Sequence, residues 1–195
     1  MELISSFPPF TQQLYGLVMT SDNHLLTMTR CGNGKALQMN PSLLKYTFRG
    51  HLVAVIPLQL PLLIKSKLRF MALSGNSLYI SDLGASYVYW VDATTGKLVD
   101  VIAGPGEKPG CFTEPSGIAC DSNGNILIGD SRSNRIQIFD GESREYKGVL
   151  ECSQKTIVRP SAICLQGDDK LIAVNYISHS VSFYSIIVET SHLSK

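Results

Sequence analysis

The chain has 195 residues, of which 44% are apolar and 17% are charged. This composition excludes a disordered chain, which combines low hydrophobicity with high net charge, and the length suits one domain or slightly more. The net charge of +1 hides an uneven distribution, because no acidic residue lies between Asp22 and Asp82. That stretch contains seven basic side chains and predicts either a solvated basic face or a surface for an anionic partner.

Cysteine usage and the apolar segments favour a cytoplasmic chain. The five cysteines are widely spread and include no CxxC pair, which is typical of reduced thiols. The first ten residues lack the basic and long apolar regions of a signal peptide. The most apolar stretch, Leu52 to Ile64, has 13 residues and two prolines, whereas a membrane-spanning helix needs about 20 apolar residues. We expect this stretch to be irregular buried chain or a strand bounded by the prolines, and we expect no membrane partner.

The rest of the chain alternates short apolar runs with clusters of Gly, Asn, Asp and Ser, which indicates strands joined by tight turns. A strand–turn–strand pattern recurs four times. In chain order, the predicted strands are residues 15–19, 25–28 and 37–39 in a weak first copy; 70–73, 78–81 and 88–92 in the second; 117–121, 125–129, 135–139 and 146–150 in the third; and 160–165, 171–174 and 181–184 in the fourth. The copies are offset by 53, 48 and 45 residues, and the gaps show no helical period.

The clearest turn lies in the third copy, where Asn123 and Gly124 separate two apolar runs. An Asn-Gly pair supplies the positive φ angles that two-residue hairpin loops require. We therefore expect residues 117–121 and 125–129 to pair as a hairpin.

These repeats predict an all-β fold, a partial β-propeller of about four four-stranded antiparallel blades. We expect residues 1–69 to hold a weak first blade plus an irregular basic and apolar insert. Residues 70–195 should hold three blades, at about 70–114, 115–159 and 160–195. A TIM barrel or Rossmann fold would need helices between its strands. A β-sandwich also uses short strands, but it does not require a period of about 45 residues.

Within the third copy, one set of residues resembles a consensus NHL repeat: Pro115–Ala119, Asp121, Gly124–Ile126, Asp130 and Asn134–Phe139. Residues 104–112 also resemble the linker that often precedes such a repeat. The resemblance is strongest to the C-terminal NHL domain of tripartite-motif proteins, many of which are RING ubiquitin ligases. It implies a partial domain, because NHL propellers usually close with about six blades, and it implies recognition of a substrate protein or of RNA. The clustered Cys/His ligands of RING and B-box zinc sites do not occur in this sequence, so any ligase activity would lie in other domains.

Several repeat positions are predicted to be structural. Asp82, Asp130 and Asn175 follow the second strand of three copies, and Thr29 takes that place in the first. A carboxylate or amide there can accept hydrogen bonds from turn amides, and Arg135 could pair with such an acid. Two glycines belong to the same set of structural repeat positions: Gly117 and Gly124.

The sequence offers little support for catalysis. The four histidines have no metal-ligand spacing, and no nucleophile or phosphate-binding motif occurs. We therefore expect a non-enzymatic module that binds a protein partner without a cofactor or metal. RNA binding through the basic stretch is the first alternative, although the near-neutral net charge opposes it, and a propeller hydrolase or lyase is the least favoured. The candidate contact residues are Arg132, Arg135, Tyr87, Tyr176, Arg30 and Lys35.

The aromatic residues of the second copy, Tyr87 among them, have another interpretation, since they could fill the space between blades. An open arc of four blades would also leave terminal edges unpaired. Because each repeat depends on its neighbours for buried surface, we expect the isolated chain to be marginally stable or to self-associate.

Overall fold

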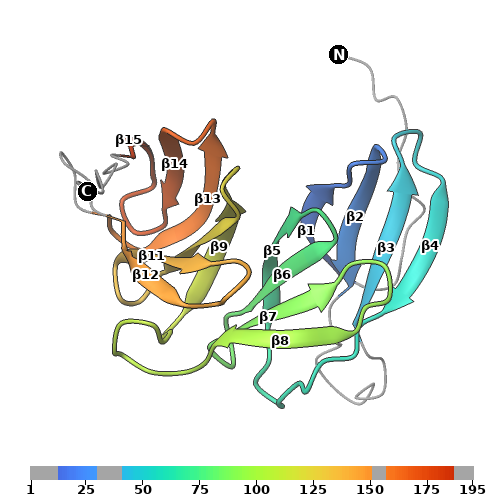
Figure 1. Cartoon of the computed structure of the whole chain (residues 1–195), viewed down its shortest axis with the longest axis horizontal. Helices are drawn as coiled ribbons and strands as arrows, with labels where there is room; N and C mark the ends of the chain where they lie inside the picture. The colour runs from blue at the N-terminus through green and yellow to red at the C-terminus, as the bar shows by residue number, and fades with distance from the viewer. Residues whose placement is uncertain (1–12, 30–40, 151–156, 187–195) are drawn as a thin grey trace, which may run out of the picture.

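A computed structural model describes residues 13–29, 41–150 and 157–186, and the fold is built from four antiparallel sheets (Figure 1). Sheet 1 contains β1 (Leu14–Met19), β2 (His24–Thr29), β3 (Ser42–Thr47) and β4 (Leu52–Pro57). Sheet 2 contains β5 (Leu68–Ser74), β6 (Ser77–Asp82), β7 (Tyr87–Asp92) and β8 (Leu98–Ala103). Sheet 3 contains β9 (Pro115–Cys120), β10 (Asn125–Asp130), β11 (Arg135–Asp140) and β12 (Tyr146–Val149). Sheet 4 contains β13 (Pro160–Gln166), β14 (Lys170–Asn175) and β15 (Ser180–Ser185).

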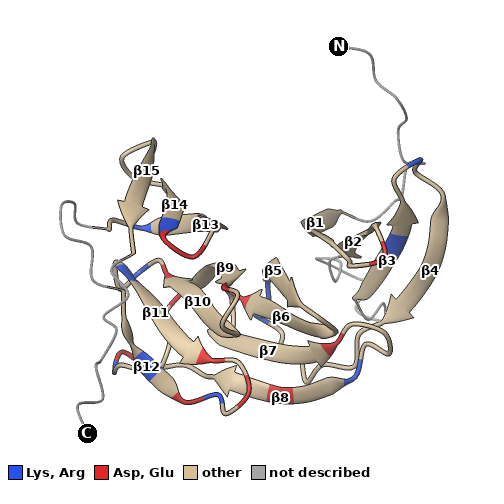
Figure 2. Cartoon of the chain, turned by 45° about the horizontal axis from the view of Figure 1, so that its top comes forward, with Lys and Arg blue, Asp and Glu red and all other residues tan. Residues whose placement is uncertain are grey.

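The four sheets follow one another around a common centre as the blades of an open propeller. In each sheet the strands pair in sequence order, and the first strands β1, β5, β9 and β13 contact one another in succession. Figure 2 shows the resulting arc, with β1 at one end and β13 at the other. The predicted all-β propeller with four repeated units is therefore confirmed. A β-sandwich is excluded, because the sheets are arranged radially.

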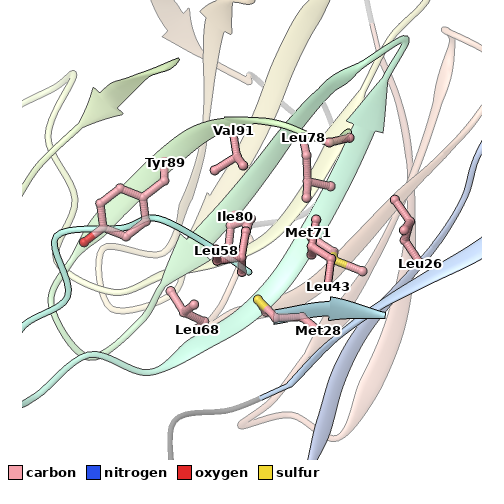
Figure 3. Close-up of a cluster of buried hydrophobic side chains, with 11 residues drawn as sticks. Leu26, Met28, Leu43, Leu58, Leu68, Met71, Leu78, Ile80, Tyr89 and Val91 are labelled. Atoms are coloured by element: carbon pink, nitrogen blue, oxygen red, sulfur yellow. The ribbon is translucent and has the colours of Figure 1, made fainter. Parts of the chain in front are cut away.

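Each pair of neighbouring sheets encloses an apolar cluster. Between sheets 1 and 2, Leu26 and Met28 of β2 pack with Met71, Leu78 and Ile80, all less than 8% exposed (Figure 3). A second cluster joins sheet 2 to sheet 3, and a third joins sheet 3 to sheet 4. Burial of such side chains contributes on the order of 1.5–3 kcal/mol each, so the contacts between sheets hold the arc together.

The hairpin between β9 and β10 forms as expected, but its turn differs from the predicted two-residue loop. The loop is four residues long, and only Gly124 has a positive φ, of 81°. Asn123 instead donates its backbone N–H to Asp121 Oδ1 at 3.0 Å, which closes a local side-chain turn. The hydrogen bond to Asp121 thus orders a four-residue loop that needs one positive φ, in place of the two-residue loop with two positive φ angles that the Asn-Gly pair predicted.

Sheet 1 departs most from the expectation. The third strand predicted at residues 37–39 lies outside the described residues, and β3 occupies Ser42–Thr47, within the segment expected to be an insert. The apolar stretch from Leu52 begins with a regular strand, β4, which ends at Pro57. The expectation of buried chain is wrong for β4, because Leu52, Val53 and Val55 are 43–54% exposed. Pro57 is compatible with this outer edge strand, where an N–H is not needed for the ladder.

Candidate partner-binding face

Loops from neighbouring sheets gather on one side of the arc. Each is either a loop between the second and third strands of a sheet or a linker that leads into a first strand. Ser86 Oγ donates to the Thr113 carbonyl at 2.9 Å, and the Arg159 N–H donates to Asn134 Oδ1 at 2.9 Å, so such loops touch across sheets. We call this surface the loop face. In the described chain it comprises the loop and linker residues 65–67, 83–86, 104–114, 131–134, 157–159 and 176–179, together with Leu68 and Arg69 at the start of β5.

Buried acids anchor the loop face to sheets 2 and 3. Asp82 Oδ1 accepts hydrogen bonds from the N–H groups of Lys67 at 2.6 Å and Ala85 at 3.0 Å. Asp130 Oδ1 does the same for Thr113 at 3.1 Å and Glu114 at 3.0 Å. Both acids are fully buried. Each carboxylate therefore ties the end of a second strand to the linker that precedes its sheet, which is a structural task.

The equivalent positions in sheets 1 and 4 use other groups. Thr29 Oγ1 accepts a hydrogen bond from the Ser42 N–H at 2.8 Å. Within the described ranges Asn175 receives no loop amides; its Nδ2 donates to Ser182 Oγ at 2.8 Å. The loop after β14 is tied by its backbone instead, since the Tyr176 N–H donates to the Arg159 carbonyl at 3.1 Å.

Arg135 is occupied within the protein. Its Nη2 lies 3.1 Å from Asp130 Oδ2 and donates to the carbonyls of Lys108 and Cys111 at 3.2 and 3.0 Å. The neighbouring Gln137 donates to the same Cys111 carbonyl at 2.8 Å. With its side chain only 15% exposed, Arg135 holds the linker of residues 104–114 in place and offers little surface to a partner.

Sheet 2 lacks this ion pair. Tyr87 stands at the position of Arg135, and Asp82 Oδ2 is buried without a hydrogen-bond partner in the described part of the chain. Tyr87 stacks on Tyr89 at 5.9 Å between ring centroids, and it lies against Gly104. Burial, with the negative charge of Asp82 as a smaller cause, raises the pKa of Tyr89. The half-buried Tyr87 is therefore largely a packing residue.

The exposed cations of the loop face come mostly from its linkers. Lys65, Lys67, Lys108 and Arg132 are exposed. Arg159 Nη1 forms an ion pair with Glu114 Oε2 at 2.8 Å. Arg69 lies over the Tyr15 ring at 4.7 Å from its centroid. Of these residues, only Arg132 was among the contact residues expected from the sequence. The sequence did contain a signal for two others, since Lys67 and Arg159 each immediately precede the first strand of a sheet.

On the opposite side of the arc, the turns between third and fourth strands of sheets 1 to 3 carry charges of both signs, whereas the turns between first and second strands are acidic. There the hairpins between first and second strands comprise residues 20–23, 75–76, 121–124 and 167–169, which hold four aspartates and no lysine or arginine. We call this surface the hairpin face. Asp168 accepts hydrogen bonds from the side chain and backbone of Ser122, which lower its pKa. Charge is thus separated between the two faces, with charged residues marked in Figure 2.

Tyr176 is the most exposed aromatic side chain of the loop face, at 70%, and Ile177 beside it is 59% exposed. Two other aromatic residues of the second copy, Tyr79 and Tyr89, are at most 3% exposed and lie between sheets, as the packing interpretation expects. Arg30 and Lys35 lie outside the described residues. The structure therefore leaves Arg132 and Tyr176 exposed on the loop face, whereas the neighbouring Arg135 and Tyr87 are engaged in contacts within the protein.

The described part of the chain contains no group of three or more His, Cys, Asp or Glu side chains arranged to hold a metal ion. Over the same residues, no helix has the length and hydropathy needed to cross a bilayer.

The radial sheets define a β-propeller protein in the form of an open arc, and comparisons with known proteins refine this class. Residues 112–139 match the family model of the NHL repeat, which covers the end of the 104–114 linker and strands β9 to β11. The resemblance to NHL-repeat propellers is therefore confirmed: the chain carries an NHL repeat in sheet 3.

Two sequence relatives support this assignment. The chain is 31% identical to "Protein brain tumor" of Drosophila melanogaster over 84 residues, which is 41% of this chain and 8% of that protein. It is 49% identical to "B-box type zinc finger protein ncl-1" of Caenorhabditis elegans over 39 residues, which is 20% of this chain and 5% of that protein. The chain thus spans a small fraction of either relative.

Solved structures share the fold. A protein of unknown function from Bacteroides thetaiotaomicron matches with a TM-score of 0.68 and 14% identity, over 91% of this chain and 48% of that one. Virginiamycin B lyase from Staphylococcus aureus matches with a TM-score of 0.57 and 16% identity, over 94% of this chain and 59% of that one. At such low identity the likeness concerns the fold alone.

Proposed function

We propose that the chain is a non-catalytic interaction module that recognises an acidic protein segment with its loop face. As the resemblance to tripartite-motif proteins implies, it would serve as the target-recognition part of a larger protein of the RING ubiquitin-ligase kind, with any ligase chemistry in other domains. The observation that supports this is the separation of charge between the loop face and the hairpin face. The near-neutral total charge conceals this separation, so it does not argue against an anionic partner.

Protein is favoured over RNA because of what surrounds the cations. Proteins that bind single-stranded RNA combine basic grooves with aromatic platforms on which successive bases stack. Among the described residues of the loop face, Tyr176 alone presents a largely exposed ring, next to the apolar Ile177. One aromatic and one aliphatic side chain beside scattered lysines suit a peptide with acidic and apolar residues better than a run of bases.

RNA remains the second candidate because its phosphates would also be attracted to Lys65, Lys67, Lys108 and Arg132. A lyase or hydrolase function has no such support, because catalysis needs a convergent set of acid, base or metal-ligating groups. The buried acids Asp82 and Asp130 are committed to loop amides instead.

The test compares a fluorescein-labelled oligo-glutamate peptide containing two leucines with a single-stranded RNA of mixed sequence, by fluorescence anisotropy at 50 and 200 mM salt. The loop-face variant is Lys65→Glu/Lys67→Glu/Arg132→Glu. Its matched control is Arg49→Glu/Lys97→Glu/Lys170→Glu, which makes the same charge change at exposed positions outside the loop face. We expect the peptide to bind, the loop-face variant to weaken binding by at least about tenfold, and the control to change it by less than about twofold.

Tighter binding of RNA than of the peptide would refute the protein proposal and support the second candidate. In that case the logarithm of the binding constant should fall with the logarithm of salt concentration by about 0.7 per phosphate contacted. Absence of binding to either probe at 50 mM salt would refute both.

A further inference from the structure

The last sheet of the arc exposes an apolar face. On the side of sheet 4 turned away from sheet 3, Val174, Val181 and Phe183 are 40%, 56% and 71% exposed, and Cys164 is also exposed. Their cross-strand pairing places them together, since Val174 pairs with Val181 and Ile172 pairs with both Cys164 and Phe183. The exposed residues therefore form one continuous surface.

In sheet 3 the same register positions are buried against the next sheet. The 45-residue offset places Leu127 at the position of Ile172 and Ile136 at that of Val181. Leu127 is 3% exposed and Ile136 is fully buried, both in the cluster that joins sheet 3 to sheet 4. The face of sheet 4 thus has the residue pattern of a junction between sheets, but the described chain supplies no further sheet to cover it.

The other end of the arc offers the complementary face. On the side of sheet 1 turned away from sheet 2, Leu17, Thr27, Leu44 and Val55 form a cross-strand row. The ends of this row are open, with Leu17 64% and Val55 54% exposed, whereas its middle members Thr27 and Leu44 are buried. The corresponding row of sheet 2, which includes Met71, Ile80 and Tyr89, packs against the preceding sheet.

Sheet 1 is also hollowed on this side. A cavity of about 540 Å³ opens beside β1, with a mostly apolar lining that includes Leu17, Leu25, Thr27, Tyr46 and Phe70. Leu25 and Thr27 occupy the positions of Leu78 and Ile80 in sheet 2, which are fully buried by contact with sheet 1. The hollow therefore lies where the side chains of a preceding sheet would pack.

We propose that two copies of this chain close into one ring, with sheet 4 of each copy packed against sheet 1 of the other. A second copy of the chain can cover both exposed faces at once, because each molecule carries one sheet 4 face and one sheet 1 face. A two-fold axis then forms two identical junctions and leaves neither face open. The longer bacterial chain that shares the fold is about twice the length matched here, so two arcs supply a comparable amount of sheet.

The contact involves sheet faces and not strand edges. Among the described residues, the first and last strands of each sheet have free edges whether or not the ring is closed, so edge pairing alone does not explain the apolar ends. Face-to-face closure also restores the inter-sheet packing that stabilises the rest of the arc, because exposed valine and phenylalanine side chains leave water.

The first experiment measures the mass of the 195-residue chain in solution by light scattering after size-exclusion chromatography. We expect a discrete dimer of twice the chain mass of 21.3 kDa. Val181→Asp should shift it to the monomer by weakening dimerisation at least about a hundredfold, because it buries a charge in each junction. The matched control is Val99→Asp, at a 50% exposed valine on the outer strand β8, which should leave the dimer intact.

Mixing variants tests how the two faces pair. Leu17→Asp on sheet 1 should also give monomers, but an equimolar mixture with Val181→Asp should recover dimers, since one of the two junctions is then unmutated. A third readout uses the unmutated chain: alkylation of Cys164 should slow as the protein concentration rises through the dimerisation range. This readout keeps the test decisive if an aspartate variant fails to fold.

A monomeric chain at all concentrations would overturn the proposal, as would a dimer that Val181→Asp leaves unchanged. Open-ended polymers growing with concentration would also overturn it, because they show head-to-tail contact without closure. None of these results bears on the loop face, so the proposed function is judged separately.

Discussion

The two buried aspartates of the loop face should respond differently to loss of charge. Asp130→Asn keeps the Oδ1 acceptor for the loop amides but removes the partner of Arg135, whose guanidinium is 3.1 Å away. Breaking a buried ion pair by removing one partner costs about 3–5 kcal/mol. Arg135 keeps three carbonyl acceptors and some solvent contact, so we expect the lower end, about 3 kcal/mol.

Asp82→Asn provides the matched comparison. It keeps the acceptor for the N–H groups of Lys67 and Ala85 and replaces an oxygen that has no hydrogen-bond partner among the described residues. The fold already accepts an amide here, since Asn175 occupies the same place in sheet 4. Replacing a fully buried carboxyl group that has no cationic partner among the described residues should therefore leave the stability within about 0.5 kcal/mol of the original, or raise it.

The assay is urea unfolding followed by the fluorescence of Trp90, the one tryptophan of the chain, at one low protein concentration. The expected loss for Asp130→Asn corresponds to roughly 6–12 °C in melting temperature for a chain of this size. Adding Arg135→Met to Asp130→Asn should recover part of the loss, because the pair is coupled. Equal effects of the two Asn substitutions would show that the ion pair does not stabilise sheet 3 as described.

Two glycines and one cysteine give further expectations. Gly117→Ala should cost on the order of 3 kcal/mol in urea unfolding, because its Cβ would lie 2.5 Å from the Ile163 backbone nitrogen and force β9 from β13. Gly124→Ala should cost only about 1 kcal/mol, because the space is open and only its φ of 81° is unfavourable; a larger loss than for Gly117→Ala would contradict this ranking. Burial raises the pKa of Cys120 to about 12, so iodoacetamide at pH 8 should modify it only after unfolding, as mass spectrometry of the folded and urea-treated chain can show.

Sheets 2 to 4 could be predicted from the sequence because their signals are local. Alternating apolar residues and Asp, Asn or Gly at the turns specify each hairpin without reference to distant residues, and the predicted strand of residues 135–139 matches β11 closely. Sheet 1 was harder to predict, because Gly50 is the one Asp, Asn or Gly residue that marks the turn between β3 and β4, and the prolines and apolar run of residues 52–64 suggested buried chain. Burial depends on the neighbouring sheet, which a local pattern does not contain.

For the residues of the candidate site too, the sequence predicted local interactions but not contacts between distant segments. That Asp130 would bind turn amides followed from its place after a strand. The partners of Arg135 did not, because the carbonyls of Lys108 and Cys111 lie 27 and 24 residues earlier in the chain. The basic character of the loop face could also be recognised only in the three-dimensional structure, since its cations come from linkers and loops of different sheets.

The separation of charge described above gives the molecule an electric dipole along the axis of the arc. A negatively charged partner would exert a torque on this dipole and turn the basic side toward itself before contact, over distances of about one Debye length, roughly 8 Å at physiological salt. Orientation of this kind raises the fraction of productive collisions and has little effect on how long a complex lasts. Salt should accordingly slow association more than it speeds dissociation.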